Sequence, residues 1–374
     1  MSFEDIKKNF GFGCMRLPMA DGEVDEVEFT KMVDTFIERG FNYFDTAHPY
    51  IEGKSEKAIK KCLTSRYPRE DYILTNKLSN SFFESEEEIR PLIDTMLDEC
   101  GVEYFDFLLM HALNAKSFEK YKRLRAFETA LELKKEGKIR HLGMSFHDTA
   151  EVLDRILTQY PEVEAVQIQF NYLDYTDPNI QSRECYEVCR KHNKPIIVME
   201  PVKGGTLALV PEKAQTIFDD LGSGSPASVA IRYAASQEGV FMVLSGMSNM
   251  DQMEDNISHM EDFEPVNERE KRAIARVAGI IKDQDIIGCT SCRYCTESCP
   301  MQILIPDLFS CFNTKKVFND EDQYKLYHEV YTVENGKASD CIKCGQCEEQ
   351  CPQNLKIREL LVDVANEFEG ANHE

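Results

Sequence analysis

The sequence predicts an α/β protein in which a (β/α)8 barrel is followed by a smaller, cysteine-rich domain. Two observations lead to this prediction. Short apolar runs alternate with longer amphipathic stretches through residues 1–260, and two lines of four cysteines stand in the C-terminal part. A chain of 374 residues has room for one domain of roughly 250 residues and a second, smaller one.

Eight runs of strand character alternate with eight helix-like stretches. We expect strands at Gly11–Met15, Asn42–Asp45, Tyr72–Lys77, Phe105–His111, Ile139–Ser145, Ala165–Gln169, Ile196–Glu200 and Val240–Ser245. We expect helices at Glu26–Glu38, Ser55–Leu63, Glu86–Cys100, Phe118–Lys135, Thr149–Leu157, Asn179–His192, Pro226–Ser236 and Met250–Ile257. The alternation indicates parallel βαβ units, and the eight-fold count favours a TIM barrel over a doubly wound sheet, which would also alternate.

An acidic segment marks the exit from the barrel. Residues 261–285 are predicted to form a linker and a packing helix, because Pro265 interrupts the chain and Asn267 with Glu270 makes a capping-box pattern. That helix is expected to reach Lys282. The predicted second domain then takes residues 286–374.

The second domain contains one four-cysteine spacing twice, each time followed by proline. Thiolates at this spacing hold cubane iron–sulfur clusters, and in two-cluster ferredoxins the fourth cysteine of each line ligates the other cluster. The expected ligands of one [4Fe–4S] cluster are Cys289, Cys292, Cys295 and Cys351. Those of the second are Cys341, Cys344, Cys347 and Cys299. Structural zinc, the alternative, uses paired cysteines rather than triplets followed by Cys-Pro.

Composition limits the classes of partner. The net charge of −23 argues against nucleic acid and anionic membrane surfaces. No run approaches the ~20 apolar residues that a membrane span needs. The fourteen cysteines, without an apolar N-terminal segment, indicate a reducing compartment. We therefore expect a cytoplasmic protein that binds neither membranes nor nucleic acid.

Polar residues end most of the predicted strands. They are Asp45, Lys77, His111, Ser145, Gln167, Gln169, Glu200 and Ser245. In a (β/α)8 barrel, functional residues come from the carboxyl ends of the strands, and a strand that only packs does not need to end on a charged group. This pattern predicts an active site outside the cysteine region.

Asp45-Thr46-Ala47-His48-Pro49-Tyr50 closes the second predicted strand, Lys77 the third and His111 the fourth. This set resembles the aldo-keto reductase family, whose sites join an Asp, a Tyr five residues later, a Lys and a His. The resemblance covers about residues 8–258. Further matching stretches are Gly11–Pro18, Gly53–Glu56, Gly137–Ser145 and Gly246–Asn256.

The four residues suit the reduction of a carbonyl, which needs a hydride at carbon and a proton at oxygen. Tyr50 is the predicted general acid, and Lys77 is expected to lower the pKa of its phenol. Asp45 would keep Lys77 charged and oriented, while His111 would hydrogen-bond the substrate oxygen. His48, in the same loop, is predicted to be an ordinary surface or loop histidine.

A Rossmann site is excluded, because no Gly-x-Gly-x-x-Gly follows the first strand. The resemblance instead implies that NADP or NAD lies along the barrel loops. Its nicotinamide amide would meet Ser145 and Gln167. Its pyrophosphate would meet Pro201, Lys203, Gly204 and Gly205, and its adenosine end Ser248, Asn249, Gln252 and Asn256. The helix from Met250 would offer N-terminal amides to phosphate.

Three residues depart from the family pattern. Phe146 stands where many members have Asn, and Met199 stands where many place an aromatic ring against the nicotinamide. Gln252 stands where an Arg typically pairs with the 2′-phosphate. Because a phosphate prefers bidentate Arg, the choice between NADP and NAD stays open, with Lys203 as a substitute cation.

The two cysteine lines are separated by 41 residues, from Pro300 to Asp340. This gap is long for a compact ferredoxin repeat and resembles the helical ferredoxin domains of succinate dehydrogenase iron–sulfur subunits. The resemblance implies a mainly α-helical domain, with helices at Pro306–Phe312, Asp320–Tyr331 and Ile357–Phe368. Its acidic excess would suit a basic redox protein partner.

Two functions of different classes follow from these patterns. The leading hypothesis is an oxidoreductase that reduces a small carbonyl substrate by hydride transfer from NAD(P)H and carries an appended electron-transfer domain. The alternative is an iron–sulfur electron-transfer or redox-sensing protein whose barrel binds nucleotide without turnover. Hydride moves two electrons together whereas each cluster moves one, and no flavin motif links the two.

Overall fold

The computed structural model describes residues 3–284 and 286–370. Residues 1–2, 285 and 371–374, which belong to the three predicted domain ranges, lie outside the described residues. The chain divides into two compact units, Met1–Pro201 with Ser228–Val266 and Val202–Ala227 with Asn267–Glu374. The predicted domain boundaries stay predictions, and the grouping of Val202–Ala227 with the C-terminal residues was not anticipated.

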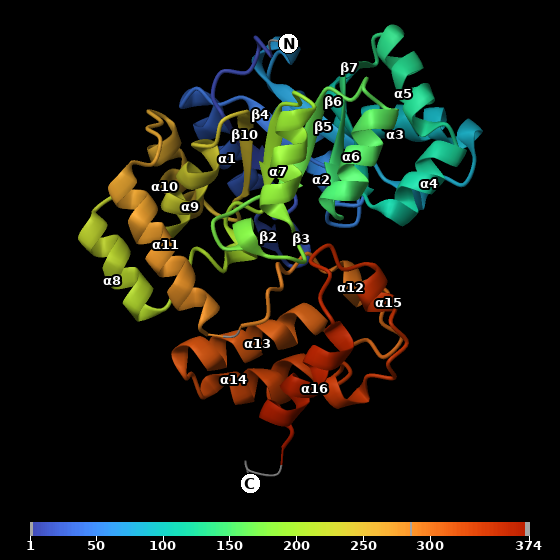
Figure 1. Ribbon diagram of the computed structural model, residues 1–374. Coiled ribbons are helices and arrows are strands. Elements are labelled where there is room, and N and C mark those ends of the chain that lie inside the picture. The colour runs from blue at the N-terminus through green and yellow to red at the C-terminus, as the bar shows by residue number, and fades with distance from the viewer. Residues whose placement is uncertain (1–2, 285, 371–374) are drawn as a thin grey trace. The chain divides into compact units, whose positions relative to one another are not determined.

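Eight parallel strands of the first unit form a closed barrel in the order β1-β10-β9-β8-β7-β6-β5-β4. The strands are β1 (Phe10–Gly13), β4 (Tyr43–Asp45), β5 (Ile73–Leu78), β6 (Phe105–Leu113), β7 (Ile139–Phe146), β8 (Ala165–Gln169), β9 (Ile196–Met199) and β10 (Val240–Gly246). Figure 1 shows them inside a ring of helices. The (β/α)8 TIM barrel is thus confirmed, and the doubly wound sheet is wrong.

Apolar side chains fill the barrel interior below the site. The cluster comprises Tyr43, Ile73, Phe107, Leu109, Ala165, Ile197, Met242 and Leu244. Packing is close enough to require glycine on β7, since a Cβ at Gly143 would lie 2.5 Å from the Leu109 side chain. Because these residues occupy the amino-terminal layers, the inward polar residues collect toward the carboxyl ends of the strands.

The helices of the first unit alternate with the strands. They are α1 (Glu26–Glu38), α2 (Lys54–Ile59), α3 (Ile89–Cys100), α4 (Ala115–Arg123), α5 (Ala126–Lys135), α6 (Ala150–Gln159), α7 (Ser182–Lys191), α9 (Pro226–Ala235) and α10 (Met250–Met260). The single helix predicted over Phe118–Lys135 is wrong, because Arg125 adopts a left-handed φ of 53° and separates α4 from α5. A short hairpin, β2 (Met19–Ala20) with β3 (Glu23–Val24), was not predicted.

The second unit is mainly helical, as predicted. Its helices are α8 (Glu212–Leu221), α11 (Glu268–Lys282), α12 (Tyr294–Glu297), α13 (Ile305–Phe318), α14 (Asp322–Lys325), α15 (Gln346–Glu349) and α16 (Ile357–Phe368). The capping box that opens α11 is present, with Asn267 and Glu270 in the expected roles. Helix α8, which packs against α11, was not predicted. Within the described parts of both units, no helix combines the length and apolar character needed to cross a membrane.

Candidate active site

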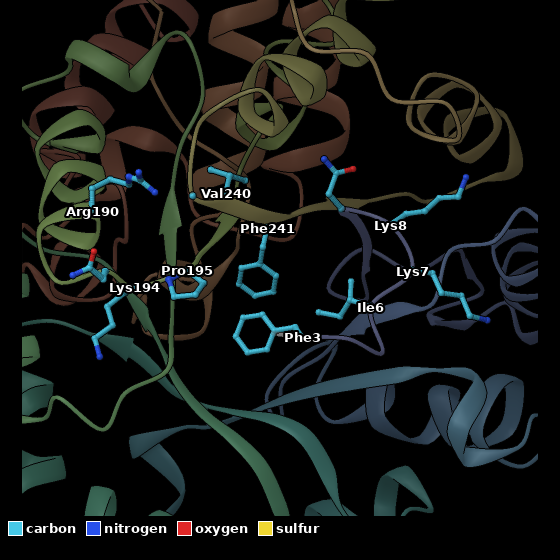
Figure 2. A pocket seen from close by; sticks show the side chains of 12 residues that line it. Phe3, Ile6, Lys7, Lys8, Arg190, Lys194, Pro195, Val240 and Phe241 are labelled. Atoms are coloured by element: carbon cyan, nitrogen blue, oxygen red, sulfur yellow. The ribbon is translucent and has the colours of Figure 1, made fainter. Parts of the chain in front are cut away.

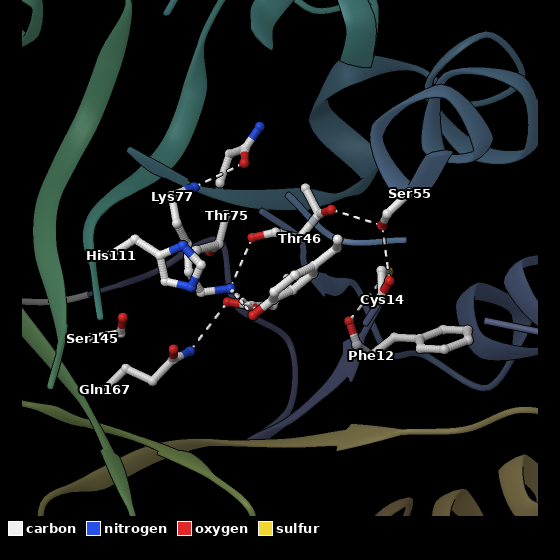
Figure 3. Close-up of polar contacts among 12 residues, drawn as sticks. Phe12, Cys14, Thr46, Ser55, Thr75, Lys77, His111, Ser145 and Gln167 are labelled. Atoms are coloured by element: carbon white, nitrogen blue, oxygen red, sulfur yellow. Dashed lines mark hydrogen bonds and ion pairs between the residues drawn. The ribbon is translucent and has the colours of Figure 1, made fainter. Parts of the chain in front are cut away.

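Lys77 lies at the centre of a buried polar cluster at the carboxyl ends of β4 and β5. Its ammonium group, with the side chain fully buried, pairs with the Asp45 carboxylate. The same group donates to the Thr46 carbonyl at 2.8 Å and to the Tyr50 hydroxyl at 3.1 Å. Figure 3 shows these contacts converging on one nitrogen. The structure therefore brings three of the four predicted catalytic residues into direct contact.

His111, from β6, completes the cluster. It is buried, its Nδ1 lies 2.5 Å from the Ser79 hydroxyl, and its ring centroid lies 5.9 Å from that of Tyr50. Burial holds the pKa of His111 well below its usual range, and the positive charge of Lys77 lowers it further. The imidazole is therefore neutral at pH 7 and acts as a hydrogen-bonding group.

The pKa of Tyr50 differs from the expectation. Burial raises it well above its usual value, the negative charge of Asp45 raises it further, and Arg16 opposes the rise. The net shift is opposite to the lowering expected from Lys77, because burial and the charge of Asp45 outweigh the opposing positive charge. Burial also raises the pKa of Asp45, against the opposing effect of Lys77. Tyr50 is consequently protonated throughout the neutral range.

A second buried network holds the loop that carries Tyr50. His48 lies in a loop, as predicted, and is half-buried: its Nδ1 lies 2.7 Å from Oε2 of Glu56, which is fully buried. The other oxygen of Glu56 accepts from Asn76 at 2.7 Å, and Asn76 directly precedes Lys77. The hydrogen bond to Glu56 raises the pKa of His48, although burial opposes the rise. Glu56 thus ties the His48 loop to β5.

Two of the predicted cofactor residues, Ser145 and Gln167, join the same cluster. Ser145 is buried on β7 and accepts from the Ala112 amide at 2.8 Å. Gln167, opposite it on β8, donates to Asp45 at 3.2 Å. Both therefore adjoin the Lys77 cluster, and Figure 3 shows them beside His111.

The residues predicted for the adenosine end cluster around the start of α10. The Asn249 side chain accepts from the Gln252 amide at 2.9 Å, and the Gln252 side chain accepts from the Ser248 amide at 2.8 Å. Asn256 is buried and donates to the Ser245 hydroxyl at 3.0 Å. A phosphate at this terminus would have to displace Asn249, since a helix amide that it would use already has a partner.

The remaining cofactor residues follow β9. Pro201 ends the first segment of the first unit, whereas Lys203, Gly204 and Gly205 form a tight turn that belongs to the second unit. Gly204 has a φ of +63°, and a Cβ there would lie 2.5 Å from the Cα of Thr290. The turn therefore packs directly on the backbone beside the first cysteine line.

The eight predicted cluster ligands gather in two groups within the second unit. One pocket is lined by Cys299 together with Cys341, Cys344 and Cys347. In the other group, burial raises the pKa of the Cys295 thiol, and nearby Cys292, Cys289 and Cys351 raise it further. Each fourth cysteine thus lies beside the other line, as crossed ligation requires. Among the described residues, no three His, Cys, Asp or Glu side chains are spaced to hold a single metal ion.

Comparison with protein families matches residues 9–278 to the aldo/keto reductase family. The chain belongs to this family. Residues 288–355 of this aldo/keto reductase match the 4Fe-4S dicluster domain, so the chain is an oxidoreductase with a C-terminal iron–sulfur domain. The family explains why the polar cluster sits at the carboxyl ends of β4, β5 and β6.

Three known proteins illustrate how similar this chain is to other members of the family. L-galactose dehydrogenase of Arabidopsis thaliana is 25% identical over 291 residues, or 73% of this chain and 90% of the relative. The NADH-specific methylglyoxal reductase of Escherichia coli is 24% identical over 274 residues, or 60% of this chain and 81% of the relative. A solved aldo-keto reductase from Bacillus halodurans, in its holo form, matches with a TM-score of 0.58 at 25% identity, covering 72% of this chain and 92% of that one.

The reductase barrel has another pocket at its opposite end. This pocket, of about 570 Å³, has an apolar floor that includes Phe3 and Phe241 and a rim that includes Lys7 and Lys194 (Figure 2). It lies before the first residues of β9 and β10, at the amino-terminal end of the strands. Chemistry in (β/α)8 barrels occurs at the other end, so this pocket is separate from the Lys77 cluster.

Proposed function

We propose that this aldo/keto reductase reduces a small aldehyde or ketone by hydride transfer from NAD(P)H, with Tyr50 as the general acid. The observation that carries the proposal is the contact of the Lys77 ammonium with both Asp45 and the Tyr50 hydroxyl. A buried cation is costly, and this one donates to the Tyr50 hydroxyl, whose pKa burial raises.

Each residue has a distinct part in the reaction. The nicotinamide, when bound, supplies the hydride that adds to the carbonyl carbon. Tyr50 delivers its proton to the oxygen, and Lys77 stabilises the phenolate that this leaves behind. Asp45 keeps Lys77 charged and fixed in a buried site. His111 donates from Nε2 to the carbonyl oxygen, since its Nδ1 already contacts Ser79. The proton on Tyr50 is then restored from solvent, so the balance is one hydride and one proton for each alcohol formed.

The nucleotide is NADP or NAD. Ser145, which bonds the Ala112 amide, and Gln167, which bonds Asp45, would hydrogen-bond the nicotinamide amide. Gln252 provides no positive charge for a 2′-phosphate, and the Escherichia coli relative is named as specific for NADH. These two observations favour NAD.

The second unit is proposed to hold two [4Fe–4S] clusters on the crossed ligand sets. The grouping of Cys299 with Cys341, Cys344 and Cys347 in one pocket supports this assignment. Bound iron would stabilise the thiolates, which burial and mutual repulsion disfavour in its absence. The clusters would exchange electrons with a basic redox protein. A reducing cytoplasm suits a chain whose fourteen cysteines form no disulfide.

Replacing Tyr50 by Phe tests the proposal. We expect Tyr50→Phe to lower kcat for aldehyde reduction by about 10²- to 10⁴-fold, because only the proton donor is removed, while the Kd for NADH or NADPH stays unchanged. The matched control is Tyr186→Phe, whose hydroxyl contacts the Glu238 carbonyl on the outside of the barrel. Wild-type rates in Tyr50→Phe would contradict the assigned acid. Nucleotide binding without turnover of any aldehyde by the wild type would instead support the electron-transfer alternative.

A further inference from the structure

The turn that follows β9 contacts the first cysteine line on both sides of Cys289. Gly288, Cys289 and Thr290 are consecutive in the chain. A Cβ on Gly288 would lie 3.5 Å from Nζ of Lys203, and a Cβ on Gly204 would lie 2.5 Å from the Thr290 carbonyl oxygen. Both segments belong to the second unit. The Lys203 ammonium therefore lies beside the backbone that carries an expected cluster ligand.

Lys203 is held in this position at two costs. It is only 6% exposed, so its ammonium is largely removed from water. Its φ of 47° lies in the left-handed region, which is strained for a residue with a side chain. A buried cation is tolerated where negative or polar groups lie close to it, and a strained backbone persists where the surrounding structure fixes it. The two costs indicate that the place of this charge has a function.

Two other cations near the cysteine lines are exposed and paired with carboxylates. Arg293, inside the first line, is 56% exposed and pairs with Asp307 at 2.6 Å. Arg358, which lines the pocket of the second ligand set, is 44% exposed and pairs with Glu348 at 2.7 Å. Water and these carboxylates offset both charges. The charge of Lys203 is less screened by water, because Lys203 is buried.

We propose that Lys203 raises the reduction potential of the first [4Fe–4S] cluster, on Cys289, Cys292, Cys295 and Cys351. One electron added to a thiolate-bound cluster increases its negative charge, and a buried cation nearby stabilises that form. The electron comes from the basic redox protein, which is oxidised by the same one electron. The inference rests on the two-cluster domain proposed above and names a residue that tunes one of its clusters.

A potentiometric titration of the anaerobically purified, cluster-containing protein, followed by electron paramagnetic resonance, tests the inference. At a fixed potential, we expect Lys203→Met to lower the ratio of reduced to oxidised first cluster about tenfold, which equals a potential lower by about 59 mV for one electron. The potential of the second cluster should stay unchanged. Cys292→Ala, which removes a ligand of the first cluster, identifies the signal that belongs to it.

Three further variants control for charge, folding and position. Lys203→Arg keeps the positive charge and should stay near the wild-type potential. Lys203→Gln gives the same measurement if Lys203→Met does not retain its iron. Lys213→Met removes an exposed lysine of α8 in the same unit and should leave both potentials unchanged.

The outcomes separate the tuning role from the presence of the clusters. Unchanged potentials in Lys203→Met, equal shifts of both clusters, or an equal shift in Lys203→Arg would each overturn the role of the Lys203 charge. An unchanged potential with a raised KM for NADH or NADPH would also overturn it and assign Lys203 to the cofactor. Wild-type protein whose iron and sulfide content excludes two cubane clusters would overturn the proposed two-cluster domain together with this inference.

Discussion

Lys77 shows how one buried charge can organise a reaction centre. A cation removed from water is tolerated only when its hydrogen bonds are complete, and Lys77 has three partners: Asp45, the Thr46 carbonyl and the Tyr50 hydroxyl. Two of these partners also fix the loop that carries Tyr50. The same contacts therefore serve stability and the orientation of the proton donor.

We expect Lys77→Met to lower the free energy of unfolding by about 3–5 kcal/mol, because Asp45 is left as an unpaired buried carboxylate. The double variant Asp45→Asn with Lys77→Met should recover part of that loss, although both should be inactive. Chemical unfolding followed by circular dichroism measures the differences. Lys57→Met is the control, since Lys57 is an exposed lysine 3.6 Å from Glu99 and should change stability little. Equal losses of unfolding free energy in Lys77→Met and in the double variant would contradict an energetic coupling between Asp45 and Lys77.

For single residues, the sequence predicted which functional side chains gather at the site, but it did not predict their burial or their hydrogen-bond partners. Asp45, Tyr50, Lys77 and His111 stand at strand ends, so their convergence follows from the barrel. The buried pairing of His48 with Glu56 depends on a helix contacting a loop, which no local pattern reveals. The raised pKa of Tyr50 likewise depends on burial and on the nearby negative charge of Asp45.

Glu164, directly before β8, ties three elements of the barrel together. Its carboxylate pairs with Lys134 of α5, lies 2.9 Å from Nδ1 of His141 on β7 and accepts from the Leu142 amide at 3.1 Å. Burial alone would raise the pKa of Glu164, but the hydrogen bonds from His141, Lys134 and Leu142 outweigh it and lower the pKa to about 2. The folded state therefore binds this proton more weakly than the unfolded chain does.

The stabilisation by Glu164 should be fully present above pH 4.5, its ordinary value, and should disappear as the pH falls toward about 2. We expect Glu164→Gln to cost roughly 2 kcal/mol of unfolding free energy at pH 7, after allowance for the partly exposed partners. The cost should shrink as the pH is lowered below about 4.5. Urea unfolding at a series of pH values checks this, with the exposed neighbour Glu162→Gln as control. If the unfolding free energy lost in Glu164→Gln did not vary with pH, the stabilisation would not come from the ionised Glu164 carboxylate.

Periodicity placed every barrel strand to within two residues, because these strands are short, apolar and buried. Periodicity did not predict the break between α4 and α5, because that break depends on local backbone geometry. The amphipathic pattern runs through Leu124 and Arg125, so only the left-handed turn at Arg125 separates α4 from α5. Helix α8 was missed because its sequence lies in a segment that packs against α11 rather than continuing the strand–helix alternation.

On the scale of the whole molecule, the turn after β9 belongs to the same compact unit as the cysteine lines. Gly204 packs on the backbone of Thr290, which lies between Cys289 and Cys292. Lys203, in the same turn, is buried. A turn expected to meet the cofactor pyrophosphate therefore packs on a residue that lies between two expected ligands of an iron–sulfur cluster. No pattern in the sequence predicted this contact, since 86 residues separate the two positions.

We expect loss of the first cluster to loosen the turn at Gly204, within the same unit. Cys292→Ala should speed hydrogen exchange of the amides in the Lys203–Gly205 turn several-fold, because the Thr290 backbone against which Gly204 packs would no longer be held in place. Cys344→Ala, in the other ligand set, is the matched control and should leave this exchange unchanged. Iron and sulfide analysis of anaerobically purified protein establishes which cluster each variant lacks. Equal effects of both substitutions would show that the Thr290 contact carries no coupling.

If two electrons move together as hydride at the barrel, a deuterium label on the nicotinamide should reach the product. Wild-type protein is supplied with a reducible aldehyde and with NADH or NADPH deuterated at C4 of the nicotinamide, in separate samples for each face. One face should deliver a single deuterium to the carbinol carbon of the product, with the hydroxyl proton coming from solvent. An unlabelled alcohol from both samples, accompanied by reduction of the iron–sulfur clusters, would contradict hydride transfer and assign the electrons to the second unit.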